Sequence, residues 1–403
     1  MNSIVFIDPF RFGHHPAYLK LFSEAALSLG CNVTLCCPDA YAMREKILSA
    51  SHHSQNGFRC IEINEPPRSS FPARILQPAL NAFSLWRAAD KTLQKVLMET
   101  GMHPDLVFFP WLDSYLSNFQ SRYVLDRIFP YRWSGLIFHP CHLRQPIWAL
   151  PLRRGPLDFD ECLNSSRCRA VGVLDEGIAF KLQSKLKGKP VVIFPDVTDS
   201  TIPDSQFPVA HRIAAQAQGR KIISLLGSLE KRKGLLPLLE IARGAECEDL
   251  FFLFAGKIIE STFTGDEMVL IRSVVAKPPG NCFFHFDYIN EEAQFNKLVE
   301  MSDILCAVYD GFLHSSNILT KAALYEKPVI VAAGHCMDER VKKYHLGVSV
   351  QYGNQVEYTE ALRALADGTA DDVAQRDFKG HRLVHSKDRL ASALKSVMKY
   401  YDM

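Results

Sequence analysis

Three consecutive cations stand between an apolar run and an amphipathic run in the segment IISLLGSLEKRKGLLPLLEIA (222–242). The apolar run predicts a strand that ends at Gly227, and the second run predicts a helix. Unpaired N–H groups give the start of a helix a partial positive charge, so cations there repel that end unless an anion arrives. We therefore predict that Arg232 and Lys233 hold a multiply charged anion at the helix N-terminus. The alternative interpretation is a solvated basic turn.

A second segment, VYDGFLHSSNILTKAALYEKPVIVA (308–332), has the same order of strand, loop and helix. The predicted strand ends at Asp310, and Ser315, Ser316 and Asn317 precede the helical run. Serine and asparagine at this place can cap the helix, and the same hydroxyls with free N–H groups can also cradle a phosphate. The two roles are compatible with each other.

Further polar residues follow other predicted strands. Gly13, His14 and His15 come after the first strand, where a glycine lets a ligand approach the backbone closely. The histidines can donate hydrogen bonds to a ligand, or one of them can cap the next helix. Asp113 can bind ligand hydroxyls or cap a helix, and Lys257 either adds positive charge near the anion or is solvated. No carboxylate or third histidine has metal-ligand spacing around the histidine pair, so no metal site is predicted.

Short apolar runs alternate with helical patterns almost throughout the chain. The predicted strands are 3–8, 32–38, 58–64, 105–110, 135–140, 170–175, 191–196, 221–227, 250–256, 282–288, 304–310, 329–333 and 347–352. They are apolar on both faces, as strands of buried parallel sheets are. The alternation predicts doubly wound α/β units of the Rossmann type.

The alternation pauses once, at a stretch rich in proline, serine and aspartate (194–208). Such a stretch is typical of an interdomain linker. We predict an N-terminal Rossmann-like domain at 1–195, a linker at 196–208 and a C-terminal Rossmann-like domain at 209–380. A last helix at 381–403 can pack on either domain. The two domains are expected to face each other across a cleft, with ligands beyond the carboxyl ends of the strands.

The composition excludes several classes of protein. The chain has 403 residues, of which 47% are hydrophobic and 22% charged, as in ordinary globular proteins. Its 46 basic and 44 acidic groups leave a net charge of +2, which gives no support for nucleic-acid binding. The 11 cysteines include no C-x-x-C pair, so a zinc ribbon or a redox dithiol is not predicted. This pattern indicates a reduced, cytoplasmic protein.

The sequence predicts no membrane-spanning segment. The start, MNSIVFIDPF, has the character of a strand and lacks the basic lead of a signal peptide. No apolar run approaches the roughly 20 residues that a membrane helix needs. The segment 66–96 mixes arginine with phenylalanine, leucine and tryptophan. It either lies at the inner membrane face as a peripheral contact or packs on the sheet as an ordinary long helix.

The two loop segments resemble the nucleotide-sugar half of GT-B glycosyltransferases, most closely the retaining family 4 type. GSLEKRKG, YDGF and EKPVIVA occur in the family's order with similar spacing. The segment CFFHFDYINEEAQFNKLVEMSDILCAVYD (282–310) resembles the part that holds the nucleobase. In the N-terminal half the resemblance rests mainly on FRFGHHPAYLKLFSEAALSLGCNVTLCCPD (10–39), which is similar to the first loop and helix of such enzymes.

This resemblance implies a role for each candidate residue. The donor diphosphate would be bound by Arg232, Lys233, Gly13, Ser315, Ser316, Asn317 and Lys257. The nucleobase would rest on Tyr288 and Ile289, and the acceptor on His14, His15 and Asp113. His139, placed at the end of a predicted strand, and Asp310 would act at the reacting sugar, although a core histidine is the alternative for His139.

The sequence also departs from the family pattern. Ser228 stands where the family usually has arginine, with Arg232 four residues later. Asp310 stands where the first of two glutamates is expected and Lys321 where the second is expected, with a longer gap between them. Either the LHSSN loop takes over donor contacts, or the donor differs, or activity is lost. The ribose contact that the family gives to the second glutamate is the one that these departures call most into question.

The predicted function is transfer of a sugar from a nucleoside-diphosphate sugar to an acceptor hydroxyl. By resemblance, the anomeric configuration is retained, no metal is needed, and no cofactor is required beyond the nucleotide sugar as co-substrate. The acceptor would be a glycan, a lipid or a small molecule. Two alternatives remain open, namely a non-catalytic GT-B-like binding or scaffold protein and a sugar-nucleotide epimerase or hydrolase. The last would need an acid/base pair, for which Asp113 and Asp310 are the candidates.

Overall fold

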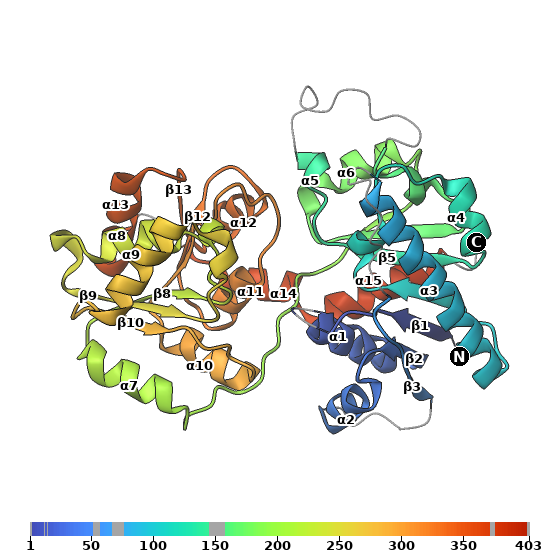
Figure 1. Cartoon of the computed structure of the whole chain (residues 1–403), viewed down its shortest axis with the longest axis horizontal. Helices are drawn as coiled ribbons and strands as arrows, with labels where there is room; N and C mark the ends of the chain where they lie inside the picture. The colour runs from blue at the N-terminus through green and yellow to red at the C-terminus, as the bar shows by residue number, and fades with distance from the viewer. Residues whose placement is uncertain are drawn as a thin grey trace. The chain divides into compact units, whose positions relative to one another are not determined.

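The computed structural model describes residues 2–11, 13, 15–50, 57–66, 76–144, 158–370 and 375–400. They form two compact units (Figure 1). The N-terminal unit comprises Met1–Val197 together with His385–Met403, and the C-terminal unit comprises Thr198–Val384. The chain thus passes between the units twice, after Val197 and again before His385.

The N-terminal unit contains a seven-stranded parallel sheet in the order β3-β2-β1-β4-β5-β6-β7. Its strands are β1 (Ser3–Ile7), β2 (Asn32–Cys37), β3 (Phe58–Glu62), β4 (Leu106–Phe109), β5 (Trp133–Ile137), β6 (Cys168–Val173) and β7 (Val191–Ile193). The strand order reverses between β1 and β4. The structure confirms the predicted strands, although β5 ends two residues before His139, which therefore lies in the following loop.

Helices cover both faces of this sheet, as Figure 1 shows. They are α1 (His15–Ser28), α2 (Ala40–Ala50), α3 (Gln77–Thr100), α4 (Arg122–Ile128), α5 (Cys141–Arg144), α6 (Glu176–Lys185) and α15 (Lys387–Lys399), with short 3₁₀ helices η1 (Leu112–Tyr115) and η4 (Glu161–Asn164). Helices α1, α2 and α15 pack on one face around Phe6 and Phe108. Helices α3, α4 and α6 pack on the other around Trp86 and Phe109.

Helix α3 takes up most of the arginine-containing segment 66–96. One of its sides is buried in the core, with Trp86 fully buried among four other aromatic rings. This packing accounts for the buried apolar residues of the helix, whereas Leu80 and Met98 are exposed. Residues 67–75 of the segment lie outside the described residues. No helix in the described part of the chain is both long and apolar enough to cross a bilayer.

The C-terminal unit contains a six-stranded parallel sheet in the order β10-β9-β8-β11-β12-β13. Its strands are β8 (Lys221–Leu226), β9 (Leu250–Ala255), β10 (Cys282–His285), β11 (Ile304–Ala307), β12 (Val329–Ala332) and β13 (Gly347–Val350). The order reverses between β8 and β11. All six strands were predicted, but β10 is shorter than expected, so that Tyr288 lies in the loop after it.

Helices again cover both faces of the sheet. They are α7 (Pro208–Ala217), α8 (Leu235–Ala242), α9 (Gly265–Ala276), α10 (Glu292–Met301), α11 (Asn317–Leu324), α12 (Cys336–Tyr344), α13 (Gln355–Ala366) and α14 (Phe378–Val384), with 3₁₀ helices η5 (Lys231–Lys233), η6 (Ala245–Cys247) and η7 (Glu260–Thr262). Helices α7, α10, α11 and α12 share one core, whereas α8, α9 and α13 share the other.

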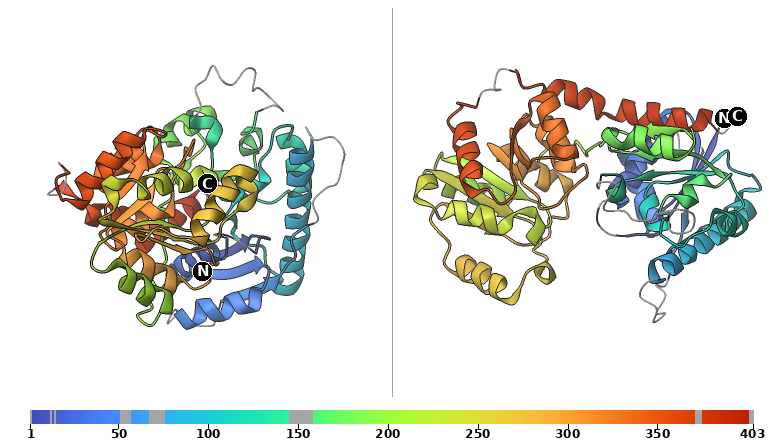
Figure 2. Two further views of the ribbon diagram at one scale, coloured as in Figure 1. Left: turned by 60° about the vertical axis from the view of Figure 1, so that its left-hand side comes forward. Right: turned by 90° about the horizontal axis from the view of Figure 1, so that it is seen from above.

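The C-terminal helix α15 belongs to the N-terminal unit, along which it lies in Figure 2. It buries Leu390 and Leu394 against α1, and Lys387 forms an ion pair of 2.8 Å with Glu24. Just before the helix, Nδ1 of His385 accepts a hydrogen bond of 3.0 Å from the backbone N–H of Asp196. This hydrogen bond joins the end of the first part of the unit, before Val197, to the start of its second part at His385.

Candidate active site

Two loops meet at the point where the strand order of the C-terminal sheet reverses. One loop follows β8 and contains η5, and the other follows β11. The backbone N–H of Asp310 donates a hydrogen bond of 2.6 Å to the carbonyl of Arg232. At Gly234, which has φ of 81°, an added Cβ would lie 2.7 Å from the carbonyl oxygen of Val308. Only glycine tolerates both this φ and this approach, so the glycine lets the loops form one surface.

The three cations of the first loop have different environments. Nζ of Lys231 lies 2.6 Å from the carboxylate of Glu267 on α9. Nε of Arg232 donates to Glu230 at 2.7 Å, and its guanidinium lies over the ring of Phe312. Both charges are therefore compensated inside the protein, and an incoming anion would compete with a carboxylate at each. Lys233 forms no ion pair or hydrogen bond among the described residues.

Of the three cations, Lys233 is the one whose charge is not already paired with a carboxylate of the described residues, so it can bind an incoming anion without competition. Its ammonium lies 3.6 Å from the position that a Cβ would take at Gly227, immediately after β8, and 5.7 Å from the ring centre of Tyr309. Burial is the main cause that lowers the pKa of Lys233 to about 8, with Glu230 raising it and Arg232 lowering it further. A half-buried cation without a partner gains more from a bound anion than a solvated one does.

The polar side chains before α11 already have partners within the unit. Arg340, which is fully buried on α12, donates a hydrogen bond to Oγ of Ser315. Ser316 is hydrogen-bonded to the buried hydroxyl of Tyr309, and the Ser316 side chain does not cap the helix. Thr198 donates a hydrogen bond of 2.7 Å to the Asn317 side-chain oxygen. The hydroxyls and the amide therefore fix the loop, and the backbone N–H groups at the start of α11 are what it offers to an anion.

The other C-terminal candidates lie at the same edge of the sheet. Lys257 is exposed after β9, and its carbonyl accepts a hydrogen bond of 2.8 Å from the N–H of Leu229. Tyr288 is 61% exposed after β10, and Ile289 packs against the core of α10 and α11. This edge therefore carries an exposed charge after β9 and an exposed aromatic ring after β10, on the β8 side of the reversal in strand order.

In the N-terminal unit, the corresponding edge holds a histidine–aspartate pair. Nδ1 of His15 lies 2.8 Å from Oδ2 of Asp8, whose side chain is buried. The His15 ring contacts Phe10 and Trp111, with ring centres 4.8 and 4.4 Å away. Burial raises the pKa of Asp8, and the hydrogen bond and charge of His15 partly offset this rise. Sequence reasoning missed Asp8, although its place directly after β1 was the available signal.

Asp113 holds the loop after β5. Its two carboxylate oxygens accept hydrogen bonds from the backbone N–H groups of Phe138 (2.8 Å) and His139 (2.7 Å). Burial raises the pKa of Asp113, whereas His139, whose Nδ1 lies 3.9 Å away, and the amide hydrogen bonds lower it. The Asp113 carboxylate thus positions His139, whose side chain is 43% exposed. Gly13 has φ of 71° with open space around it, and His14 lies outside the described residues.

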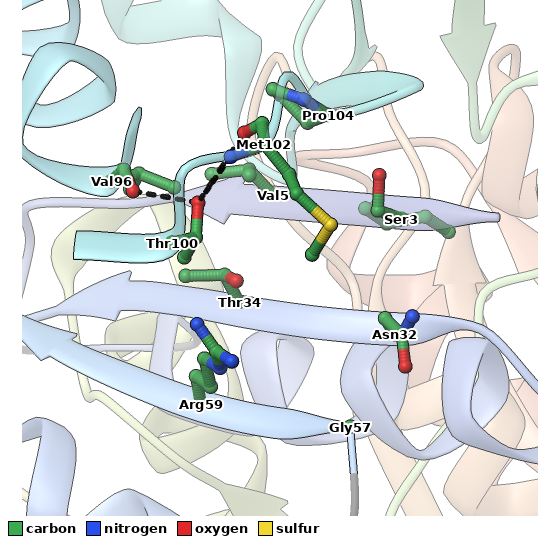
Figure 3. Close-up of a pocket in the computed structure, with 11 residues that line it drawn as sticks. Ser3, Val5, Asn32, Thr34, Gly57, Arg59, Val96, Thr100, Met102 and Pro104 are labelled. Atoms are coloured by element: carbon green, nitrogen blue, oxygen red, sulfur yellow. Dashed lines mark hydrogen bonds between the residues drawn. The ribbon is translucent and has the colours of Figure 1, made fainter. Parts of the chain in front are cut away.

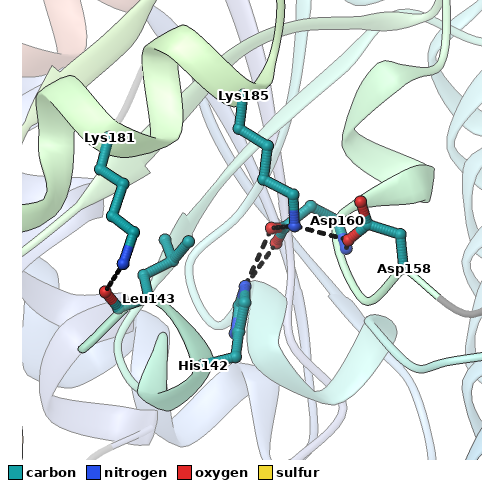
Figure 4. Close-up of polar contacts among 6 residues, drawn as sticks. All are labelled: His142, Leu143, Asp158, Asp160, Lys181 and Lys185. Carbon is teal, nitrogen blue, oxygen red and sulfur yellow. Dashed lines mark hydrogen bonds and ion pairs between the residues drawn. The ribbon is translucent and has the colours of Figure 1, made fainter. Parts of the chain in front are cut away.

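A buried ionic cluster lies beside α6, as Figure 4 shows. Nε2 of His142 lies 2.9 Å from both oxygens of Asp160, and Nζ of Lys185 lies 2.5 Å from Asp160 and 2.6 Å from Asp158. Lys181 also donates to the carbonyl of Leu143 (Figure 4). These contacts tie α5 and the chain before η4 to one helix. The cluster has a structural role and was not anticipated from the sequence.

A small cavity of about 210 Å³ lies at the opposite edge of the N-terminal sheet. Figure 3 shows Arg59 and Thr34 from the strands and Thr100 and Met102 from the end of α3 around it. Because it lies at the amino ends of β1 and β2, it is separate from the residues that the sequence singled out. Open parallel sheets bind their ligands at the other edge.

Comparison with known proteins gives matches among solved structures only. Neither a protein-family profile nor a curated protein sequence matches the chain. A glycosyltransferase from Rickettsia africae is similar at 16% identity and a TM-score of 0.67, covering 99% of this chain and 98% of that one. Sucrose-phosphate synthase from Thermosynechococcus elongatus has 15% identity and a TM-score of 0.63, with 99% and 97% covered. Anabaena Alr3699/HepE in complex with UDP and glucose has 12% identity and a TM-score of 0.61, with 100% and 98% covered. The chain therefore has the predicted fold, that of the GT-B glycosyltransferases.

Proposed function

We propose that the protein is a glycosyltransferase that moves a sugar from a nucleoside-diphosphate sugar to an acceptor hydroxyl. The observation that carries the proposal is the environment of Lys233, a half-buried cation that has no ion pair or hydrogen bond among the described residues and lies where the strand order of the C-terminal sheet reverses. A donor diphosphate is the anion that suits this place, because the start of α11 adds N–H groups beside it. The similarity to a structure that holds UDP and glucose supports a nucleotide-sugar donor.

In the proposed reaction the protein orients the two substrates and stabilises the charge of the leaving group. The bond between the anomeric carbon and the diphosphate oxygen breaks, and a bond from the acceptor oxygen to that carbon forms. The leaving diphosphate gains negative charge, which Lys233 and the α11 N-terminus would stabilise. We propose that the leaving phosphate takes the acceptor proton and that the anomeric configuration is retained, as the sequence resemblance implies. We also propose that no metal ion takes part, so that a chelator would leave the rate unchanged.

The acceptor would bind at the N-terminal edge formed by the loops after β1, β4 and β5. His15, held by Asp8, and His139, held by Asp113, present ring nitrogens that can bond sugar or other hydroxyls. The aromatic rings beside them supply an apolar surface. We propose that a glycan, a lipid or a small molecule binds at this edge as the acceptor. We also propose that the protein is cytoplasmic.

A turnover assay tests this function. Purified protein is incubated with UDP-, GDP- and ADP-sugars and a panel of sugar and lipid acceptors, and released nucleoside diphosphate and product mass are measured. We expect one donor to be consumed, with activity lost in Lys233→Met and kept in Lys231→Met, which removes the same charge from a residue paired with Glu267. The configuration of the product, measured by NMR, tests retention.

One observation favours a second candidate, a donor-binding protein without activity. Lys321 occupies the place of a family glutamate and is buried in an internal network. This candidate predicts donor binding without product for any acceptor. An epimerase or hydrolase is less well supported, because the Asp113 carboxylate is occupied by two backbone amides.

A further inference from the structure

The residue that replaces a family glutamate, Lys321, is buried on α11 yet keeps its charge compensated. Its Nζ donates hydrogen bonds to Oδ1 of Asn296 (2.6 Å), to Oε2 of Glu292 (3.0 Å) and to the carbonyl of Asp199 (3.3 Å). Removing a charge from water is costly unless it is paired and hydrogen-bonded. Of these three acceptors only Glu292 carries a negative charge, so Lys321 holds this carboxylate in place.

The contact with Lys321 leaves the Glu292 carboxylate partly accessible to solvent. Its side chain remains 46% exposed, whereas that of Lys321 is 6% exposed. Lys321 is the only hydrogen-bond or ion-pair partner of Glu292 among the described residues, and it contacts Oε2. The carboxylate therefore has oxygen lone pairs that face solvent at a position fixed by a buried ammonium.

The position of Glu292 lies between the two parts of the proposed donor site. Glu292 begins α10, directly after the loop that carries Tyr288 and Ile289, where the nucleobase would rest. The carboxylate reaches Lys321 on α11, the helix whose start would face the diphosphate. In a nucleoside diphosphate the ribose lies between base and phosphate, so a residue that bridges these two elements is well placed to meet it.

We propose that Glu292 binds the ribose hydroxyls of the donor and that Lys321 is its positioning residue. The proposal rests on the proposed function. A carboxylate accepts hydrogen bonds from both hydroxyls of a vicinal diol, as acidic residues do at the ribose of dinucleotides. The negative charge that the family pattern has at position 321 of α11 would thus be supplied from α10, with Lys321 holding the Glu292 carboxylate. No metal or second co-substrate is needed for this contact.

The same network also has a structural function, which a test must distinguish from the proposed ribose contact. The side-chain amide of Asn296 donates a hydrogen bond of 2.7 Å to the carbonyl of Thr201, and Lys321 contacts Asp199. The chain that enters the C-terminal unit is therefore fixed to α10 and α11 by the same residues. If the network were only structural, its loss would lower stability and weaken the binding of ribo- and deoxynucleotides alike, so the ratio of the two affinities isolates the ribose contact.

The test compares the binding of UDP, GDP and ADP with that of their 2′-deoxy analogues by calorimetry. The wild type should bind the ribonucleotide about tenfold or more tightly, the range expected for a hydrogen bond to a charged group. In Glu292→Ala this ratio should fall close to one, whereas Glu291→Ala, the neighbouring exposed carboxylate, should keep it. Lys321→Met should also reduce the ratio although Glu292 is present.

The outcomes separate this inference from the proposed function. If the wild type binds ribo- and deoxynucleotides equally, or if Glu292→Ala keeps the wild-type ratio, the ribose role of Glu292 is overturned while the donor site stands. If the wild type binds no nucleoside diphosphate, both proposals fall. Glu292→Gln keeps a hydrogen bond to Lys321, so it serves as the second variant if the alanine variant does not fold, and its ratio should fall as well.

Discussion

The backbone N–H of Asp310 lies 2.6 Å from the carbonyl oxygen of Arg232, which joins the loop after β11 to the loop after β8. The two loops come from strands that are adjacent in the sheet and distant in the sequence. Their contact places Lys233, the start of α11 and Asp310 around one point. The proposed diphosphate site therefore depends on the fold of the whole C-terminal unit.

Gly234 tests whether this contact matters for stability. In Gly234→Ala, the new Cβ would meet the carbonyl of Val308 at 2.7 Å, and φ of 81° is strained for alanine. We expect the free energy of unfolding to fall by about 1–3 kcal/mol, measured by urea denaturation. The control is Gly265→Ala at the start of α9, where nothing lies within 4 Å of the added Cβ and the change should be near zero or slightly favourable. Equal effects at both positions would contradict the role of Gly234.

Lys233 predicts a pH dependence of donor binding. Burial, with Arg232 adding to it, lowers the pKa of this amine to about 8, so it is protonated below that pH and neutral above it. Because the diphosphate favours the charged form, binding above pH 8 requires proton uptake, and the affinity should fall by up to about tenfold per pH unit. Calorimetric titrations with UDP between pH 6.5 and about 9.5 check this. In Lys233→Met the affinity should be weak and flat over that range, and an equally steep fall in the variant would assign the effect to another group.

A substitution at Asp113 tests whether this residue positions His139 without affecting donor binding. Asp113→Asn keeps one oxygen that can accept a hydrogen bond, but its NH₂ group faces the other backbone N–H, so the loop after β5 should shift. We expect kcat/KM to fall by about tenfold to a hundredfold while the dissociation constant for the nucleoside diphosphate is unchanged. Calorimetry and an initial-rate assay on one preparation measure both quantities. A parallel loss of donor affinity would show that Asp113 acts on the donor instead.

The cluster around Asp160 predicts a loss of stability in acid. Burial alone would raise the pKa of Asp160, but the hydrogen bond and charge of His142 and the charge of Lys185 outweigh it, so the folded-state pKa lies below the ordinary value. The stabilisation is therefore present above the pKa of the unfolded state and is lost as the pH falls through the lower folded-state pKa. Asp160→Asn should lower the free energy of unfolding by about 3 kcal/mol at pH 7 and make its decline between about pH 5 and 3 shallower. Chemical denaturation at several pH values measures this, and an unchanged slope would exclude Asp160 as the responsible group.

The sequence predicted the fold because the strands are nearly continuous apolar runs. Segments such as LFFLF in β9 and VIVA in β12 have that pattern for one reason, burial on both faces of a parallel sheet. Strand ends were less well predicted, since the runs 135–140 and 282–288 include loop residues whose apolar side chains pack outside the sheet. This is the case for Phe138, which stacks on Trp111.

The candidate residues were predicted by type, whereas their partners were not. Nothing in the spacing of EKRKG shows that Lys231 pairs with Glu267 on α9, or that Lys233 has no carboxylate partner in the described part of the chain. Asp8 and Glu292 were likewise not anticipated. Asp8 is paired with His15 and Glu292 with Lys321. The tertiary packing brings each pair together, so the sequence alone does not reveal them.

Titration of UDP, GDP and ADP into the wild type, Lys233→Met and Lys231→Met tests the central claim most directly. We expect at least one of these nucleotides to bind the wild type and the Lys231 variant with similar affinity. The same nucleotide should bind Lys233→Met at least about tenfold more weakly, since a hydrogen-bonded charge pair is lost. Absence of binding to the wild type, or equal binding to all three proteins, would contradict the assignment of a donor diphosphate site to the loop after β8.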